Sequence, residues 1–328
     1  MQIRQGGTNM EYKKIVVIGG GVLGSQIAFQ SAYNGYDTTI LIRKEDNKPK
    51  IKRSLEKLQK TYVETLTEMT PKHNWARGLG DPNSFNREKQ LEIANNTLEK
   101  LKITTNQQEA FDDADLVIES ITENIEIKRN LYAQIAGLLP EKTVIVTNSS
   151  TLLPSKLASY TKRPNKFLSM HFANSIWKNN IVEVMGHDKT EQKYFDEIIE
   201  FAKTIRMIPL PVTKEKSGYL LNSMLVPFLL SALDLYANGI SDPQSIDDAW
   251  TLGTGAPKGP FRIMDTVGLE TVKNIVEQYQ KVPGIINPLL KKMMLPYNYK
   301  GMLEIVNKYI SEGKLGKNSG EGFYKYED

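Results

Sequence analysis

The pattern of apolar and polar positions divides the chain into two parts. As far as about residue 213, short apolar runs alternate with longer segments in which apolar residues recur every three or four positions. The short runs are typical of buried strands and the longer segments of amphipathic helices. Strand and helix in alternation predict an α/β domain with a mostly parallel, doubly wound, Rossmann-like sheet. The apolar runs lie at 15–18, 38–42, 101–104, 113–120, 143–148, 166–172, 180–185 and 206–212.

The helical segments of this first part are amphipathic. The longest predicted helix covers about 49–68, where Ile51, Leu55, Leu58, Tyr62 and Leu66 recur at helical spacing. A stretch containing Pro, Gly and Asn follows and predicts a loop. That loop covers 70–86, and further helices are expected at 87–100, 124–139 and 190–204.

Beyond residue 213 no strand pattern appears until the last few residues. A long apolar helix is expected at 219–236, with Pro227 as its kink. A helix starting within 241–250, a Gly- and Pro-rich loop at 253–261, and helices at 270–280 and 300–311 complete this part. We therefore expect an α/β domain over 13–213 and an all-helical domain over 214–328. Residues 1–12 are expected to be a disordered leader, with Met10 as an alternative start, because 1–10 lack the apolar core of a secretory signal.

Glycines follow the first strand at the spacing that dinucleotide binding requires. The motif is Gly19-x-Gly21-x-x-Gly24, and an amphipathic helix starts at once. Gly19 permits a sharp turn, Gly21 lets the backbone approach a pyrophosphate, and Gly24 lets the helix pack close to the strand. The start of the helix, at Val22 and Leu23, offers unpaired N–H groups and a partial positive charge to the anion. A second strand arrives at the right distance, so the motif predicts a dinucleotide site rather than a plain glycine turn.

The residue after the second strand bears on the choice of cofactor. An acidic side chain there accepts the ribose 2′-hydroxyl of NAD, whereas this chain has Arg43 followed by Lys44. A guanidinium binds phosphate through two N–H donors and stacks on adenine. The pair favours NADP over NAD. Alternatively, both are solvated loop charges, and Glu45 or Asp46 turns toward the ribose.

Length and composition narrow the class of protein. The 328 residues suit two domains, and a content of 40% hydrophobic and 24% charged residues is ordinary for a globular protein. The formal net charge is +4, with the cations spread along the chain, so we expect anionic small-molecule ligands and no nucleic acid. The absence of cysteine excludes disulfides and Cys-based sites. No apolar run approaches the ~18 residues of a membrane span. We expect a cytoplasmic enzyme with no bound metal and no membrane partner.

A hydride transfer to or from an alcohol carbon also requires that the hydroxyl proton moves, and imidazole suits this role at neutral pH. The chain has three histidines, of which only His171 ends an apolar strand. A structural histidine is the alternative interpretation of that position. Glu183 lies among apolar residues in the next strand, where an unpaired carboxylate would be costly to bury. This favours a pairing between Glu183 and a cation or donor. Ser150 and an amide such as Asn174 or Asn222 are candidates to hold the substrate oxygen.

Taken together, these residues resemble the L-3-hydroxyacyl-CoA dehydrogenase family, which includes 3-hydroxybutyryl-CoA dehydrogenases. The resemblance runs from about Lys13 to Tyr326, nearly the whole chain. The segments that carry it are the glycine motif, SITEN at 120–124, NSST at 148–151, HFANS at 171–175, SGYLLNSMLVP at 217–227, and the stretches 245–271 and 315–326.

The resemblance implies a mechanism. His171 would take the 3-hydroxyl proton in oxidation or give it in reduction, and Glu183 would orient and stabilise the imidazolium. Ser150 and Asn222 would hold the substrate oxygen while the hydride passes to or from the nicotinamide.

The resemblance also implies cofactor contacts and an assembly. Glu123, Lys128 and Asn174 stand at cofactor-contact positions of the family, with Asn174 linking the nicotinamide side to the histidine. Members of the family are usually dimers joined through the helical domain, so a homodimer is expected.

Some positions depart from the family pattern. Arg43 replaces the acidic residue, Ser175 replaces a proline, and the large Trp177 follows, which suggests a reshaped acyl pocket. The connection at 70–90 is longer than usual, near where the family contacts CoA. A second reading is therefore the same chemistry on a free 3-hydroxy acid or diketo compound, as in gulonate- and carnitine-type relatives. A third is a non-catalytic nucleotide-binding or structural protein, against which the joint presence of the four residues of the mechanism argues.

Overall fold

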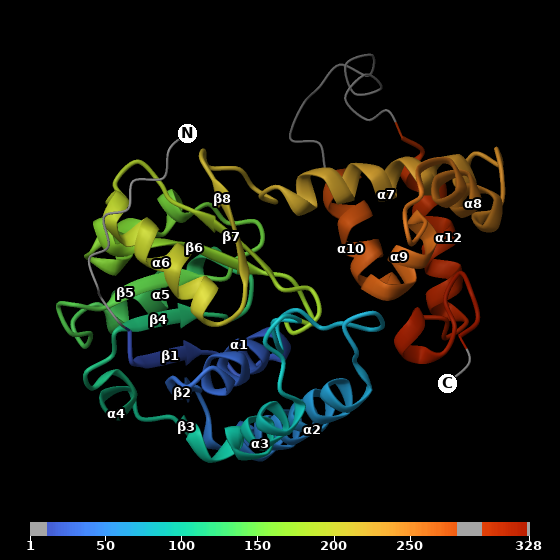
Figure 1. Ribbon diagram of the computed structural model, residues 1–328. Coiled ribbons are helices and arrows are strands. Elements are labelled where there is room, and N and C mark those ends of the chain that lie inside the picture. Colours follow the sequence, from blue (N-terminus) through green and yellow to red (C-terminus); the bar gives the residue numbers. More distant parts are fainter. Residues whose placement is uncertain (1–11, 281–296, 327–328) are drawn as a thin grey trace, which may run out of the picture. The chain divides into compact units, whose positions relative to one another are not determined.

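The computed structural model describes residues 12–280 and 297–326, and it divides the chain into two compact units, 1–220 and 221–328 (Figure 1). Most of the expected leader lies outside the described residues. Tyr12, its last residue, is buried, and its hydroxyl donates a hydrogen bond of 3.1 Å to Glu197. Tyr12 therefore belongs to the folded core rather than to a leader.

The first unit is built on one sheet of eight strands, which confirms the expected mostly parallel, doubly wound architecture. The spatial order is β3-β2-β1-β4-β5-β6-β7-β8. All neighbouring strands are parallel except β6 and β7, which are antiparallel. The strands are β1 (Lys14–Ile18), β2 (Asp37–Leu41), β3 (Leu101–Thr104), β4 (Leu116–Glu119), β5 (Val144–Thr147), β6 (Phe167–Phe172), β7 (Ile181–Met185) and β8 (Ile208–Val212).

Each face of this sheet is covered by helices, so the strands are apolar on both sides. In β1, Ile15 and Val17 belong to one hydrophobic cluster, and Val16 and Ile18 to another, as the two-residue period of a strand requires. The first cluster takes side chains from α1 (Val22–Tyr33), α2 (Lys48–Glu68) and α6 (Gln192–Thr204), and the second from α4 (Gln107–Phe111) and α5 (Ile125–Ile135).

The loop expected at 70–86 joins α2 to α3 (Arg87–Asn96), and it is tied down by hydrogen bonds. The N–H of Gly78 donates to the carbonyl of Trp177 at 3.0 Å, and Nε2 of Gln30 donates to the carbonyl of Gly78 at 2.8 Å. The Trp177 ring is buried against Tyr62, with 5.4 Å between ring centroids. The bulk of Trp177 therefore fills the core of this unit, and its effect on an acyl pocket stays a prediction.

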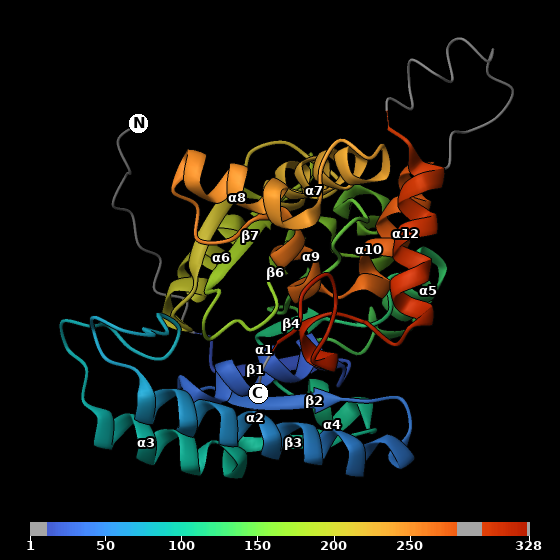
Figure 2. The ribbon, with the colours of Figure 1, turned by 90° about the vertical axis from the view of Figure 1, so that its right-hand side faces the viewer.

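The second unit is helical, as expected. It contains α7 (Leu221–Ala237), α8 (Pro243–Thr254), α9 (Pro260–Val267), α10 (Leu269–Gln280) and α12 (Tyr299–Ser311), and α10 packs beside α12 (Figures 1 and 2). The sequence reading missed α9, because its first residues lie in the Gly- and Pro-rich stretch. Only 255–259 forms the connection, and the N–H groups of Phe261 and Arg262 in the first turn of α9 donate to the Asp247 carboxylate. Within the described part of the chain, none of the helices is sufficiently long and apolar to span a bilayer.

Candidate active site

The glycine-rich turn has the geometry that the motif predicts. Gly19 has φ +108°, a region that side chains disfavour, and a Cβ there would strike the carbonyl oxygen of Ser120. A Cβ at Gly24 would strike the carbonyl oxygen of Gly19, so the helix packs too closely for any side chain. Gly21 is different, because a Cβ there would meet no protein atom within 4 Å. It is the N-cap of α1 and its open side is a cradle above the first N–H groups of the helix.

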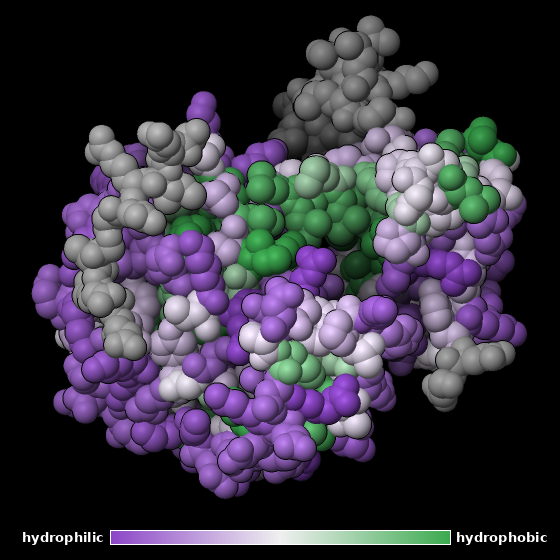
Figure 3. All heavy atoms as spheres, in the orientation of Figure 1, coloured by the Kyte–Doolittle hydropathy of each residue, from purple (hydrophilic) through white to green (hydrophobic). Residues whose placement is uncertain are grey.

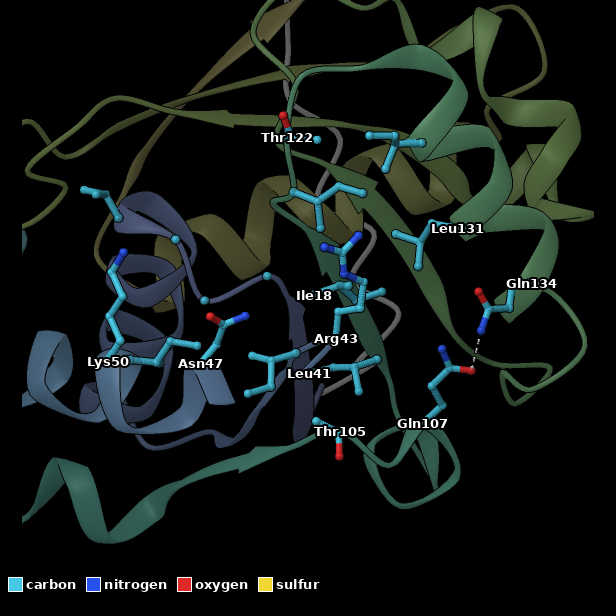
Figure 4. Close-up of a pocket in the computed structure, with 18 of the residues that line it drawn as sticks. Ile18, Leu41, Arg43, Asn47, Lys50, Thr105, Gln107, Thr122, Leu131 and Gln134 are labelled. Carbon is cyan, nitrogen blue, oxygen red and sulfur yellow. Dashed lines mark hydrogen bonds between the residues drawn. The ribbon is translucent and has the colours of Figure 1, made fainter. Parts of the chain in front are cut away.

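A cavity of about 840 Å³ opens beside this turn, at the carboxyl ends of β1 and β2. Its size is typical of a small-molecule site. Figure 4 shows the Arg43 side chain extending into it from the end of β2, with Asn47 and Lys50 on another side. The lining residues are Ile18, Gly19, Gly20, Gly21, Val22, Leu41, Ile42, Arg43, Asn47, Lys50, Ile51, Ser54, Thr105, Gln107, Ile121, Thr122, Ile127, Asn130, Leu131 and Gln134.

The three residues that follow Arg43 do not line this cavity. Lys44 and Asp46 are exposed and Glu45 is held by two partners. The hydroxyl of Thr105 donates to Glu45 at 2.8 Å, and the Lys48 ammonium lies 3.7 Å from its other oxygen. Arg43 is therefore the first charged residue after β2, and it reaches the cavity.

Three of the expected site residues come together at the edge of β6. His171 stands directly opposite Glu183 in the antiparallel β6–β7 pair, and its Nδ1 lies 2.9 Å from Oε2 of Glu183. The other ring nitrogen, Nε2, lies 3.1 Å from Oγ of Ser150. His171 and Glu183 are both buried, whereas Ser150 is half-buried. Glu183 is therefore buried together with a partner, as its apolar surroundings predicted, and that partner is His171.

This geometry selects the imidazole tautomer. A buried, ionised carboxylate accepts a hydrogen bond, so Nδ1 of His171 carries the proton that points to Glu183. Nε2 is then the basic nitrogen, and it faces the Ser150 hydroxyl. The arrangement can take a proton from a hydroxyl near Ser150, and Glu183 stabilises the imidazolium that results.

Lys128 lies deep in the first unit. Its Nζ is 2.5 Å from Oε1 of Glu119 and 3.8 Å from Oε2 of Glu123, and its side chain is 1% exposed. The other oxygen of Glu119 accepts from the hydroxyls of Tyr132 and Thr147. Lys128 thus neutralises a buried carboxylate. Glu119 was not among the sequence candidates, although a carboxylate inside an apolar strand is the same signal that singled out Glu183.

Glu123 holds the chain on both sides of Ser150. Its Oε1 accepts from the Ser149 hydroxyl at 2.6 Å and from both the N–H and the hydroxyl of Thr151 at 2.8 Å. Burial by itself raises the pKa of a carboxyl, but these hydrogen bonds and the charge of Lys128 hold the pKa of Glu123 below its usual value. The Glu123 carboxylate is therefore ionised at neutral pH, and it orders the segment that carries Ser150.

The two asparagines lie apart in the chain. Asn174 is exposed, and its carbonyl accepts from the side-chain amide of Asn179 at 2.8 Å. Oε1 of Gln26, on α1, accepts from the N–H of Ser175 at 2.9 Å and so anchors the loop that carries Asn174. Sequence reasoning did not single out Gln26, although it is a buried polar residue just after the glycine motif. Asn222 lies at the start of α7, in the second unit. The roles of both asparagines remain predictions.

Family models match both units of the chain. The model for the NAD-binding domain of 3-hydroxyacyl-CoA dehydrogenase matches residues 14–216, and the model for the C-terminal domain of 3-hydroxyacyl-CoA dehydrogenase matches residues 218–326. Together they cover nearly the whole chain.

Individual relatives match over similar lengths. The mitochondrial hydroxyacyl-coenzyme A dehydrogenase of Homo sapiens is 33% identical over 316 residues, covering 96% of this chain and 91% of the relative. A 3-hydroxybutyryl-CoA dehydrogenase of Clostridioides difficile is 29% identical, covering 95% and 99%. A solved structure of a diketoreductase, described as acting on dicarbonyl compounds, is 40% identical with a TM-score of 0.81, covering 96% and 99%.

Proposed function

We propose that this chain, which belongs to the 3-hydroxyacyl-CoA dehydrogenase family, is an oxidoreductase that interconverts L-3-hydroxyacyl-CoA and 3-oxoacyl-CoA with a nicotinamide cofactor. One observation carries the proposal within the molecule. His171 joins Glu183 through one ring nitrogen and Ser150 through the other, at 2.9 and 3.1 Å. A non-catalytic protein has no need of such a buried, polarised imidazole.

The glycine turn fits a dinucleotide. The open side of Gly21 gives a pyrophosphate room to reach the N–H groups of Val22 and Leu23, and the cavity continues past the end of β2. When bound, the nicotinamide supplies the hydride acceptor or donor. Glu123 and Asn174 are proposed to line the nicotinamide end.

For the adenosine end we propose a preference for NADP(H). Arg43 reaches into the cavity directly after β2, where an acidic residue would favour NAD. Lys50 lines the same cavity and adds a second positive charge. A 2′-phosphate is the part of the cofactor that the Arg43 guanidinium suits.

The chain's own residues handle the proton. In oxidation, Nε2 of His171 takes the proton of the 3-hydroxyl, and in reduction it returns that proton to the oxygen. The Ser150 hydroxyl holds the same oxygen, and Asn222 of the second unit is proposed to complete its hydrogen bonding. Glu183 keeps the imidazole oriented and offsets its positive charge while it is protonated.

A second candidate function has a specific observation in its favour. The diketoreductase structure is 40% identical to this chain, more than the hydroxyacyl-CoA and 3-hydroxybutyryl-CoA dehydrogenases named in the previous section. The same His171–Glu183 pair can reduce a 3-oxo compound that carries no CoA. Under this reading the substrate is a free dicarbonyl or 3-oxo acid.

One experiment separates the two. Acetoacetyl-CoA and free acetoacetate are each offered with NADH and with NADPH, and oxidation of the cofactor is followed by absorbance. We expect turnover of the CoA ester with NADPH. Turnover of the free acid alone would replace the acyl-CoA assignment with the dicarbonyl one. Activity in none of the four mixtures would contradict both.

We also propose that the protein is a homodimer joined through its helical unit. Apolar side chains are exposed on α8 and beside α7, with Leu252 85% and Ile240 69% exposed, and apolar surface is visible over both helices (Figure 3). Leu252→Glu is expected to give a monomer by light scattering. A wild-type monomer, or a variant that stays dimeric, would contradict this assembly.

A further inference from the structure

We propose that Tyr219 is a positioning residue for the catalytic imidazole, and that the segment 216–220, which leads into α7, is part of the catalytic apparatus. The inference rests on the proposed function, because it gives Tyr219 a role through His171. It is argued from contacts that all lie within the first unit.

The Tyr219 ring lies flat against the His171 ring. The centroids are 4.7 Å apart and the planes differ by 17°. Other aromatic pairs in this unit, such as Phe29–Tyr62 and Tyr132–Phe167, meet edge to face. Tyr219 is 1% exposed, so its ring has no freedom to swing away. Glu183 fixes where Nδ1 points, and the stacked ring fixes the plane of the imidazole, which together aim Nε2 at Ser150.

The hydroxyl of Tyr219 contacts Ser149, the residue before Ser150. It donates to the carbonyl of Ser149 at 2.8 Å. Burial raises the pKa of the Tyr219 hydroxyl, so it keeps its proton at neutral pH and remains a donor. One side chain therefore contacts the histidine through its ring and the Ser149–Ser150 backbone through its hydroxyl. It thereby links the base to the segment that carries the group facing it.

The backbone of segment 216–220 also holds Glu183, the partner of His171. The N–H of Leu220 donates to Oε1 of Glu183 at 2.8 Å, on the oxygen that does not face His171. Tyr219 has φ +50°, directly after Gly218 at φ +79°. A bulky residue with positive φ is uncommon and is kept only where its surroundings determine it. The hydrogen bond from the Ser217 hydroxyl to the carbonyl of Thr151, at 2.9 Å, fastens the segment to the same loop.

The Tyr219 ring also stabilises the charge that His171 carries during the reaction. During the reaction His171 becomes an imidazolium, and the face of an aromatic ring attracts a cation placed over it. Tyr219 therefore favours the charged imidazole in the state in which it holds the substrate proton. Phenylalanine at this position would keep that effect, whereas leucine would lose both it and the flat surface.

The test compares three variants of the full-length protein with the wild type. Tyr219→Leu removes the stacked ring, Tyr219→Phe restores it without the hydroxyl, and Tyr33→Leu removes a buried tyrosine of α1 that contacts Gln90 and not His171. We expect Tyr219→Leu to lower kcat by roughly tenfold or more with little change in cofactor KM. Tyr219→Phe should recover most of kcat, and Tyr33→Leu should keep it. A Tyr219→Leu kcat equal to that of Tyr33→Leu, or a Phe variant as slow as the Leu variant, would overturn the proposal.

A measurement without substrate separates this inference from the proposed function. The chain has three histidines, and the ring protons of His171 are assigned by their loss in His171→Ala. A stacked aromatic ring shifts them upfield in the proton NMR spectrum, so Tyr219→Leu should move them downfield and Tyr33→Leu should not. If the wild type is inactive on every substrate but this shift is seen, the proposed function fails while the stacking stands. If the shift is absent, the positioning role fails.

Discussion

His171 and Glu183 are cross-strand partners in β6 and β7, the antiparallel pair of the described sheet. Opposed residues in such a pair place their side chains on the same face with adjacent Cβ atoms. A slip of one residue in the pairing would send Glu183 to the other face. The short connection between the two strands therefore brings together an acid–base pair from residues 12 positions apart.

Replacement of the imidazole tests the proton transfer directly. His171→Ala should lower kcat by about 10²-fold or more, because general acid–base catalysis contributes at least that much. Cofactor affinity, measured by quenching of protein fluorescence, should stay near that of the wild type. His73→Ala is the matched control, since His73 is exposed in the loop after α2. Turnover of His171→Ala close to that of the control would remove His171 from the mechanism.

Exchange of the charge after β2 tests the cofactor preference. Arg43→Asp places a carboxylate where it can accept a ribose 2′-hydroxyl and repel a 2′-phosphate. The ratio of kcat/KM for NADPH over that for NADH should fall by roughly tenfold or more, as loss of a charge-assisted hydrogen bond predicts. Lys44→Asp should change the ratio little, because Lys44 does not line the cavity. An unchanged ratio in Arg43→Asp would mean that Arg43 is a solvated loop charge.

Removal of the buried ammonium tests the structural part played by Lys128. Lys128→Met leaves Glu119 buried without its counter-ion, which should cost roughly 3–5 kcal/mol of stability. Lys142→Met breaks pairs with Asp113 and Asp115 in which the Lys142 side chain is 40% exposed, and it should cost about 1 kcal/mol or less. Urea unfolding followed by circular dichroism compares the two. A Lys128→Met protein as stable as Lys142→Met, yet weak in cofactor binding, would show that Lys128 serves the cofactor alone.

Much of the fold could be predicted from the sequence, because buried residues recur along the chain with the period of a strand or a helix. The runs that became β1 and β5 are apolar on both faces, and the spacing from Ile51 to Leu66 marks the buried face of α2. The same reasoning missed α9, whose start is disguised by Gly259 and Pro260. The pattern of apolar residues within a segment shows which face of a helix or strand is buried. It does not show which distant segments of the chain pack against that face.

The site residues divide in the same way, into those that the local sequence indicates and those that only the folded structure brings to the site. Ser150, His171 and Glu183 could be selected singly, because Ser150 follows the apolar strand β5, His171 lies near the end of β6 and Glu183 interrupts β7. The ring of Tyr219 could not, since an aromatic residue in an apolar stretch reads as core. Its contact with His171 joins segments 48 residues apart in the chain, and only the folded structure brings them together.

The pKa of Glu123 gives a prediction about acid. Because the folded protein holds this pKa below its unfolded value, the carboxylate stabilises the fold above about pH 4.3. That contribution is lost as the pH falls from there through the lower, folded pKa. Glu123→Gln should be less stable than the wild type by about 1 kcal/mol or less at neutral pH, since the side chain is partly exposed. The difference should shrink as the pH falls below about 4.

Urea unfolding at several pH values measures this difference. Glu126→Gln is the control, because Glu126 pairs with Arg129 at the surface and should contribute little. A gap between Glu123→Gln and the wild type that stays constant from neutral to acidic pH would mean that the ionised form of Glu123 is not what orders the Ser149–Thr151 segment.

The glycine turn allows the contribution of the fold to be separated from that of the cofactor. Gly24→Ala places a methyl group against the carbonyl of Gly19, so it should destabilise the protein by about 1–3 kcal/mol. Gly21→Ala meets no protein atom, and because Ala is a poorer N-cap than Gly it should cost about 1 kcal/mol or less. Yet Gly21→Ala occupies the space that the pyrophosphate needs, and it should raise the cofactor Kd by roughly tenfold or more.

Gly137→Ala serves as the reference for both, because a methyl group at Gly137, just after α5, also meets no protein atom and lies away from the lining of the cavity. Thermal unfolding without cofactor and a titration with NADPH give the two readings for each variant. The two readings should differ between the variants. Gly24→Ala should lose mainly stability, Gly21→Ala mainly cofactor affinity, and Gly137→Ala neither. If Gly21→Ala bound cofactor as tightly as Gly137→Ala, the dinucleotide would have to enter the cavity without approaching the start of α1, and the proposed role of that helix N-terminus would be lost.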